Sequence, residues 1–321
     1  MLVNTPYDDV FKTLANDCKE LLIPVVNEAF GEYFIGNEKI TFYPNEHFIN
    51  QKDGKERERI TDTCFEISGE YTKKYHIECQ STADSNMLIR MFEYDTQIAL
   101  DNGEIEGNIL KVHFPNSAVL YLRSNKNTPD IMHVQMITPG GELSYPIRVI
   151  KMKSYTLEDI FEKKLLFLIP FYIFVHEKEL SVYNEEKDRL QELLEEFEYI
   201  KQRLETLNEQ GVINEFVRLA IIDMTKKVVK HFAKNYKQVQ KGVRAVMGGK
   251  VLEYEAKTIL KKGIAQGLEQ GLEQGLQEGL VQGKIFTYIE MIRDGIFTVS
   301  EAAKRLDMPV EKLEEFLTKN E

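Results

Sequence analysis

The sequence predicts an α/β fold, in which a mixed central sheet is flanked by helices and followed by an all-α C-terminal extension. In the first half of the 321 residues, strand-length runs rich in β-branched and aromatic residues alternate with helical periodicity. From Thr156 onward the periodicity is helical to the end. The hydrophobic content of 43% supports a sizeable core.

The first half opens with two expected helices. Thr5 is placed to be an N-cap, Pro6 to be the first helical residue, and Asp8 to be an acid in the first turn. A second helix is expected from Lys19 to about Phe30, ending near Gly31. A third helix is expected over 85–100, and strands are expected at 39–50, 59–67, 75–80, 117–124, 131–137 and 146–152.

The polar turn 68–74 joins two of these segments, 59–67 and 75–80, into an expected hairpin. A second polar turn is expected over 51–58. The chain therefore divides into a first domain over 1–155, a helical region over 156–260, a linker over 261–284 and a small helix-turn-helix-like tail over 285–321. That tail is interpreted either as a packing module or as a DNA reader.

Apolar residues within the helical region repeat with spacings of 3, 4, 3, 4 and 3; they are Leu190, Leu193, Phe197, Ile200, Leu204 and Leu207. A helix packed on its own domain explains this seam about as well as a dimeric coiled coil does. The linker carries glycine and leucine every four residues. We expect it to be a helical linker or an oligomerisation element, so a homo-oligomer could form through either segment.

The net charge of −11 argues against general binding of polyanions, so charge has to be considered locally. Residues 185–209 hold nine acids, whereas 224–252 hold none. The basic residues of that second segment form either a solvated helix face or a stripe that contacts DNA phosphates; they are Lys226, Lys227, Lys230, Lys234, Lys237, Lys241, Arg244 and Lys250.

Three cysteines without a CxxC pair indicate reduced thiols in a cytoplasmic protein. The longest apolar run, Leu165 to Val175, is too short to span a bilayer and contains Pro170, so it predicts buried protein and no membrane partner. The start of the sequence lacks the pattern of a secretory signal.

The expected hairpin carries the candidate chemistry. Glu78 and Gln80 are two residues apart on a strand and therefore share one face. If the register sum of the hairpin is even, such as 140 or 142, Asp62 lies opposite one of them; an odd sum puts Asp62 on the other face. Two converging carboxylates would bind a hard cation such as Mg²⁺, which acidifies water and stabilises phosphoryl charge. The alternative is a solvated strand face.

Four blocks in this order resemble the PD-(D/E)XK nuclease superfamily, and specifically the recombination-promoting nuclease family, whose members are often labelled transposases. They are "TPYDDVFK" (5–12), "ERERITDTCFEI" (56–67), "YHIECQS" (75–81) and "NMLIRMFEYDTQIAL" (86–100). The resemblance covers roughly the first 100 residues well. It implies a restriction-endonuclease-like core.

The resemblance also implies roles for the hairpin residues. Asp62 and Glu78 would bind Mg²⁺ or Mn²⁺ through their carboxylates, and Cys79 would bind it through its backbone carbonyl, which leaves the thiol as inert core. Gln80 stands where the superfamily pattern has lysine. It can orient the attacking water but brings no positive charge.

Supporting roles are implied for three further residues. Asp8 would bind metal through water, or else serve as a capping residue. Arg90 and Tyr94 are four apart and share a helix face. Arg90 would support Glu78 or a phosphate, or form a structural ion pair. His76 shares the face of Glu78 and is expected to be a satisfied sheet residue.

The function so implied is a metal-dependent DNA endonuclease, linked to DNA recombination or mobile elements. The alternative is a weakly active or inactive nuclease fold that binds DNA or assembles through its helical C-terminal region. A transposase with a DDE triad fits poorly, because the close D…E-x-Q hairpin is the wrong carboxylate arrangement for it.

Overall fold

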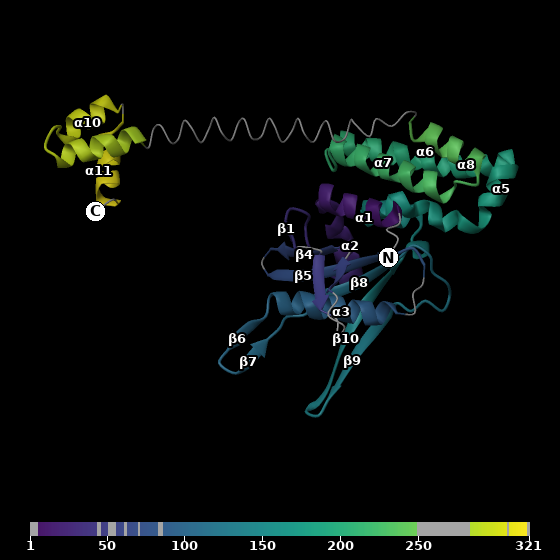
Figure 1. Ribbon diagram of the computed structural model, residues 1–321. Coiled ribbons are helices and arrows are strands. Elements are labelled where there is room, and N and C mark those ends of the chain that lie inside the picture. The colour runs from purple at the N-terminus through teal and green to yellow at the C-terminus, as the bar shows by residue number, and fades with distance from the viewer. Residues whose placement is uncertain are drawn as a thin grey trace. The chain divides into compact units, whose positions relative to one another are not determined.

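A computed structural model describes residues 6–43, 46–50, 56–60, 63–69, 71–82, 86–248, 283–306 and 308–319. The chain forms two compact units, Met1–Glu253 and Tyr254–Glu321 (Figure 1).

The first unit is built on a six-stranded sheet. Its order is β1 (Lys39–Phe42), β4 (Thr63–Ser68), β5 (Thr72–Gln80), β8 (Asn116–Tyr121), β10 (Gly141–Lys151) and β9 (Ile131–Thr138). The strands β1, β4 and β5 form an antiparallel meander, β5, β8 and β10 are parallel, and β9 is an antiparallel edge strand. The prediction of an α/β fold with a mixed sheet is confirmed.

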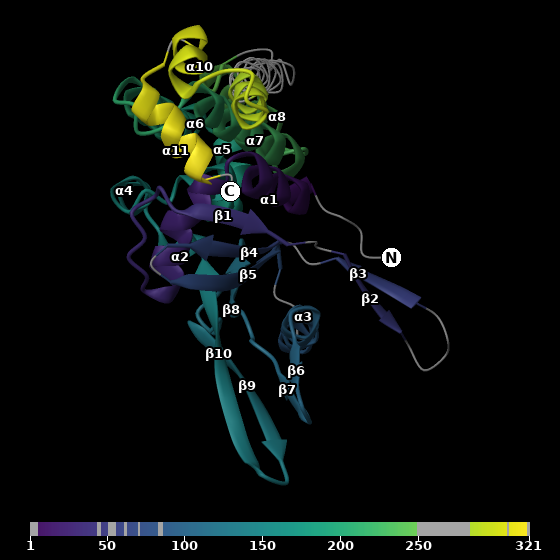
Figure 2. The same ribbon diagram turned by 90° about the vertical axis from the view of Figure 1, so that its left-hand side faces the viewer.

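Two small hairpins accompany this sheet (Figure 2). They pair β2 (Glu46–Asn50) with β3 (Glu56–Ile60), and β6 (Glu104–Glu106) with β7 (Ile109–Lys111). The predicted strand 39–50 is therefore two strands, β1 and β2. The predicted strand 59–67 is likewise divided between β3 and β4, and the predicted turn 51–58 ends inside β3. The sequence reasoning missed the β6–β7 hairpin.

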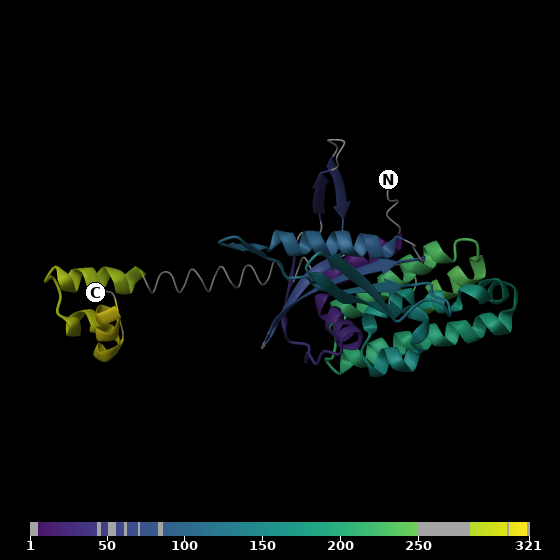
Figure 3. The ribbon, with the colours of Figure 1, turned by 90° about the horizontal axis from the view of Figure 1, so that it is seen from below.

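Helices cover both faces of the sheet (Figure 3). One face is covered by α3 (Met87–Asp101), which connects β5 to the parallel strand β8. On the opposite face lie α1 (Pro6–Asp17), the 3-10 turn η1 (Lys19–Leu21) and α2 (Leu22–Phe30). Gly31 ends α2 with φ of 68°, in the left-handed region that favours glycine.

The helices of the second half pack on the α1 side. After η2 (Met152–Ser154) they are α4 (Leu157–Glu162), η3 (Leu166–Glu179), α5 (Leu180–Glu185), α6 (Lys187–Glu209), α7 (Glu215–Phe232) and α8 (Lys237–Val246). One hydrophobic core runs from Tyr7 through the sheet to Met247. The structure thus differs from the predicted division at 155/156, because residues on both sides of it share this core.

The apolar run predicted to be buried forms η3, and its residues from Leu165 to Phe174 are buried. Among the described residues, no helix combines the length and apolar character needed to cross a membrane. The seam of α6 also faces inward: Leu193, Phe197, Ile200 and Leu204 are each at most 1% exposed. Of the two alternatives for this seam, the structure favours packing on the domain's own core.

The second unit is a small helical bundle. A helix at 283–293 precedes α10 (Val299–Arg305) and α11 (Val310–Lys319), and apolar side chains from all three form its core. The Thr298 hydroxyl accepts a hydrogen bond from the backbone of Glu301, whose carboxylate caps α10 in return. Most of the predicted linker, residues 261–282, lies outside the described residues, so its role stays a prediction.

Candidate active site

The alternation of β5 separates two chemically different faces. Tyr75, Ile77 and Cys79 face the main core on the α1 side, whereas His76 and Glu78 contact residues of α3. Because β8 runs parallel to β5, the carboxyl ends of both strands point the same way. In α/β sheets such an edge is where ligands bind. Glu78 therefore sits near the edge at which a functional site is expected.

The hairpin register is even. Thr63 pairs with Ile77 and Cys64 pairs with His76, so the residue numbers of each described pair add to 140. This is one of the two sums for which the sequence places Asp62 on the face of Glu78. Asp62 itself lies outside the described residues.

The Glu78 carboxylate is held by two cationic groups. His76 Nε2 lies 3.1 Å from Glu78 Oε1, and Arg90 Nη2 lies 3.4 Å from Glu78 Oε2. The side chains of Glu78 and His76 are 0% exposed, and that of Arg90 is 19% exposed. A buried carboxylate without partners is strongly disfavoured. The contact with Arg90 fits both the expected support of Glu78 and the alternative of a structural ion pair.

His76 joins Glu78 to a second buried carboxylate. Its Nδ1 lies 2.7 Å from Asp95 Oδ1, on α3. Ser117 Oγ donates to the same oxygen at 2.7 Å, and Tyr145 OH donates to Oδ2 at 3.2 Å. A satisfied sheet histidine was expected from the sequence, and these contacts confirm it, but the roles of Asp95, Ser117 and Tyr145 were not foreseen.

Both ring nitrogens of His76 face carboxylate oxygens, which only accept hydrogen bonds. A neutral imidazole has a single N–H donor, so this arrangement suits the imidazolium form. Burial lowers the pKa of His76, but the hydrogen bonds and charges of Asp95 and Glu78 outweigh burial and raise the pKa to about 10. The positive charges of Arg90 and of the His76 imidazolium then offset the negative charges of the Glu78 and Asp95 carboxylates.

Tyr94 completes this face of α3. It is 1% exposed, and its ring stands nearly perpendicular to the His76 ring at 5.9 Å between centroids. The Arg90 guanidinium lies 5.8 Å from the centre of the Tyr94 ring. Tyr94 thus packs against both of the groups that hold Glu78.

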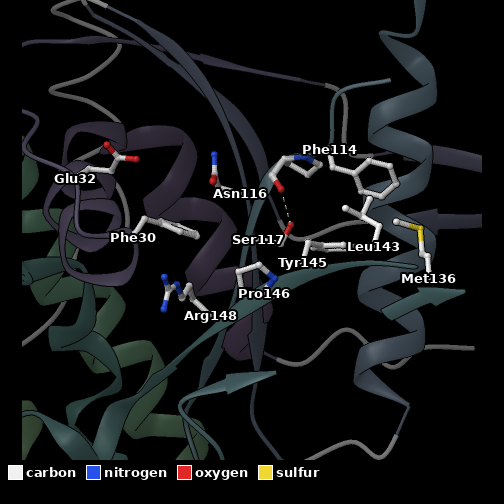
Figure 4. A pocket seen from close by; sticks show the side chains of 11 residues that line it. Phe30, Glu32, Phe114, Asn116, Ser117, Met136, Leu143, Tyr145, Pro146 and Arg148 are labelled. Carbon is white, nitrogen blue, oxygen red and sulfur yellow. Dashed lines mark hydrogen bonds between the residues drawn. The ribbon is translucent and has the colours of Figure 1, made fainter. Parts of the chain in front are cut away.

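A hollow of about 280 Å³ opens near the start of β8 (Figure 4). Ser117 and Tyr145 form part of its wall, beside Phe114, Leu143 and Met136. On the side of Phe30 the wall also contains Arg148. The carboxylate of Asp95 is therefore held by two hydroxyl groups from the lining of this hollow.

The donor chemistry fits a hard cation such as Mg²⁺ or Mn²⁺, which prefers carboxylate and carbonyl oxygens. Glu78 supplies a carboxylate, each oxygen of which has two lone pairs. The Gln80 carbonyl turns toward β8, where it accepts from the Leu122 N–H. Since successive carbonyls of a strand alternate, that of Cys79 turns toward β4. No group of three metal-ligating side chains occurs within the described ranges, so the predicted set requires Asp62.

The remaining predicted residues take varied positions. Gln80 is the last residue of β5 and is partly buried. The Cys79 thiol is buried in the main core, as expected. Asp8 lies in the first turn of α1 and is partly buried; its predicted role in metal binding stays a prediction. Its alternative role in capping depends on Thr5, which lies outside the described residues.

The predicted basic stripe divides into two groups. Lys226 lies 3.7 Å from Asp223, and Lys227 lies 3.7 Å from Asp9, so these two are engaged within the fold. The other described members are exposed on α7 and α8 or between them: Lys230, Lys234, Lys237, Lys241 and Arg244. This second group is positioned to meet a large anionic partner, and the Lys227 side chain, which is 39% exposed, is also reachable from solvent.

Comparisons with protein-family models, with curated proteins and with solved structures give no significant match for this chain. The geometry of its own residues therefore carries the functional conclusion.

Proposed function

We propose that this chain is a metal-dependent DNA endonuclease that hydrolyses phosphodiester bonds. The observation that carries the proposal is the Glu78 carboxylate, which is fully buried close to the carboxyl end of β5 and held between His76 and Arg90. Burying a hydrophobic side chain at such a position would cost less free energy than burying a carboxylate. A buried carboxylate with a fixed orientation is therefore a candidate functional group. This agrees with the role that the resemblance implies for Glu78.

Glu78, Asp62 and the Cys79 carbonyl would hold Mg²⁺ or Mn²⁺. The even register of the described β4–β5 pairs supports including Asp62. The bound ion supplies a more acidic water and stabilisation of the charge that builds on the phosphate. His76 and Arg90 compensate the charge of Glu78 and fix its orientation. Gln80, on the same face of β5, orients the attacking water through its amide, which both donates and accepts hydrogen bonds.

The DNA contacts would come from the exposed basic residues of α7 and α8, which meet phosphates without reading sequence. The resemblance adds a biological setting in recombination or mobile elements, in a cytoplasmic protein.

Substitution of the two carboxylates tests the function. Purified Asp62→Ala and Glu78→Gln variants are compared with the wild type for nicking of supercoiled plasmid DNA in Mg²⁺. We expect cleavage to fall by about 100-fold or more in both, because each loses a metal ligand. Circular dichroism verifies that each variant is folded.

Glu66→Gln is a matched control for this test. Glu66 lies on the same strand as Thr63 and accepts a hydrogen bond from Tyr43 OH at 2.6 Å, away from the Glu78 network. We expect this variant to cut DNA as the wild type does. If folded Asp62→Ala or Glu78→Gln also cut at the wild-type rate, the endonuclease assignment would be wrong.

A second candidate is a weakly active or inactive nuclease fold that binds DNA or assembles through its helical region. It is favoured by the two cations already on Glu78 and by Gln80, which lacks the positive charge of a lysine. Measuring DNA affinity in Ca²⁺ and cleavage in Mg²⁺ and Mn²⁺ separates the two candidates. Tight binding without cleavage in any of these ions would favour the second.

A further inference from the structure

We propose that Asp95 and His76 form a positioning pair that sets the cation affinity of Glu78, and that Ser117 and Tyr145 fix this pair from the far side. This inference rests on the proposed function of Glu78. It assigns a role to four residues of which the sequence analysis singled out only His76, and there only as a satisfied sheet residue.

A continuous chain of contacts links Glu78 to Asp95. His76 reaches Glu78 at 3.1 Å and Asp95 at 2.7 Å, and all three side chains are 0% exposed. The imidazole thus bridges two carboxylates and cannot rotate without losing one of them. Its orientation, and with it the direction in which it donates to Glu78, is set by Asp95.

Asp95 is itself held by several contacts. Its carboxylate accepts from three donors on three different elements: His76 on β5, Ser117 on β8 and Tyr145 on β10. The orientation of the Asp95 carboxylate is therefore fixed by three strands of the sheet, and not only by the rotamer preference of Asp95 on α3. Ser117 is 1% exposed, so its hydrogen bond is shielded from water.

The Asp95 carboxylate also fixes Glu78 indirectly. Without it His76 keeps a single carboxylate partner, and the direction in which His76 donates to Glu78 is no longer fixed. A less fixed Glu78 is expected to bind a cation more weakly. Partners that orient a metal ligand commonly alter metal affinity by about 10–100-fold.

Mn²⁺ binding gives a readout that does not depend on catalysis. Free Mn²⁺ is measured by electron paramagnetic resonance in titrations of the full chain. We expect Asp95→Asn, which keeps the shape of the side chain, to raise the Mn²⁺ dissociation constant about tenfold. Tyr145→Phe, which removes a single donor to Asp95, is expected to raise it about threefold. In cleavage assays, a higher Mn²⁺ concentration should restore the activity of both variants. If their activity were low because part of the protein was unfolded, added Mn²⁺ would not restore it.

Tyr43→Phe is the matched control, because it also removes one phenol–carboxylate hydrogen bond from the same unit, at Glu66. We expect wild-type Mn²⁺ affinity for it. The inference is overturned if folded Asp95→Asn binds Mn²⁺ as the wild type does while Glu78→Gln binds it at least tenfold more weakly. If Asp95→Asn does not fold, Tyr145→Phe and Ser117→Ala decide, and unchanged affinity in both overturns the inference. If Glu78→Gln itself binds like the wild type, the proposed function fails instead.

Discussion

Raising the pH should destabilise the first unit in a window set by His76. The folded pKa of His76 is about 10, whereas an unperturbed histidine has a pKa of about 6.5. A pKa raised by folding contributes stability that is fully present below the unfolded value and is lost as pH rises through the folded value. Between these two limits the folded chain keeps a proton that the unfolded chain releases.

The size of the effect follows from that difference. Each pKa unit corresponds to about 1.4 kcal/mol, so the free energy of unfolding should fall by about 2 kcal/mol between pH 7 and 8.5. The window ends at pH 8.5 in order to limit the contribution from titration of the buried thiols of Cys18 and Cys64. Burial raises the pKa of both to about 12, which adds a loss of the same sign at higher pH.

Urea unfolding followed by far-UV circular dichroism measures this dependence, since the chain contains no tryptophan. Asp95→Asn is the informative comparison, because Asp95 is the main group that raises the pKa of His76. Its curve should be flatter over the same window. Stability of the wild type that stays constant or rises between pH 7 and 8.5 would refute the reasoning.

Two further predictions concern the helical region. Phe197→Ala should lower the free energy of unfolding by about 3–5 kcal/mol, because Phe197 is fully buried in its own core; an unfolding midpoint that depends on protein concentration would favour the coiled-coil alternative instead. Replacing the exposed basic residues by glutamine should weaken DNA binding and reduce its salt dependence, with a slope change of about 0.9 per lost phosphate contact. Fluorescence anisotropy at several salt concentrations measures this, and an unchanged slope would remove these residues from the DNA interface: Lys230, Lys234, Lys237, Lys241 and Arg244.

Sequence patterns predicted much of the fold because the signals were local. The N-terminal proline and the glycine after α2 mark helix ends, and the hairpin turn between β4 and β5 allowed the even register that the structure shows. The β2–β3 hairpin was harder to foresee. Its second strand, "ERERI", alternates acidic and basic residues and has no apolar face, so the sequence pattern predicts a polar turn there.

The candidate site was predictable only in part. Glu78 and Arg90 lie in sequence blocks with recognisable spacing, and the structure brings them together. Asp95 lies in the same block as Arg90, but nothing in the pattern distinguished it, because an aspartate within an amphipathic helix usually faces solvent. A weak hint was available in His76, a titratable residue on an otherwise buried strand. Its partner Asp95 comes from α3, and the donors that hold Asp95 come from β8 and β10, so only the packing of those elements shows this network.

The shared core has a consequence for how the chain is made. The sheet and α1 are complete once synthesis passes Lys151, yet the apolar surface on the α1 side is covered only when α7 and α8 have followed, near Met247. At about 5–20 residues per second, a ribosome needs roughly 5–20 s for that interval. During that interval the apolar side chains on the α1 side of the nascent sheet are exposed to solvent. The first 155 residues are therefore expected to bind chaperones during translation, and to be insoluble if expressed without the helices that follow.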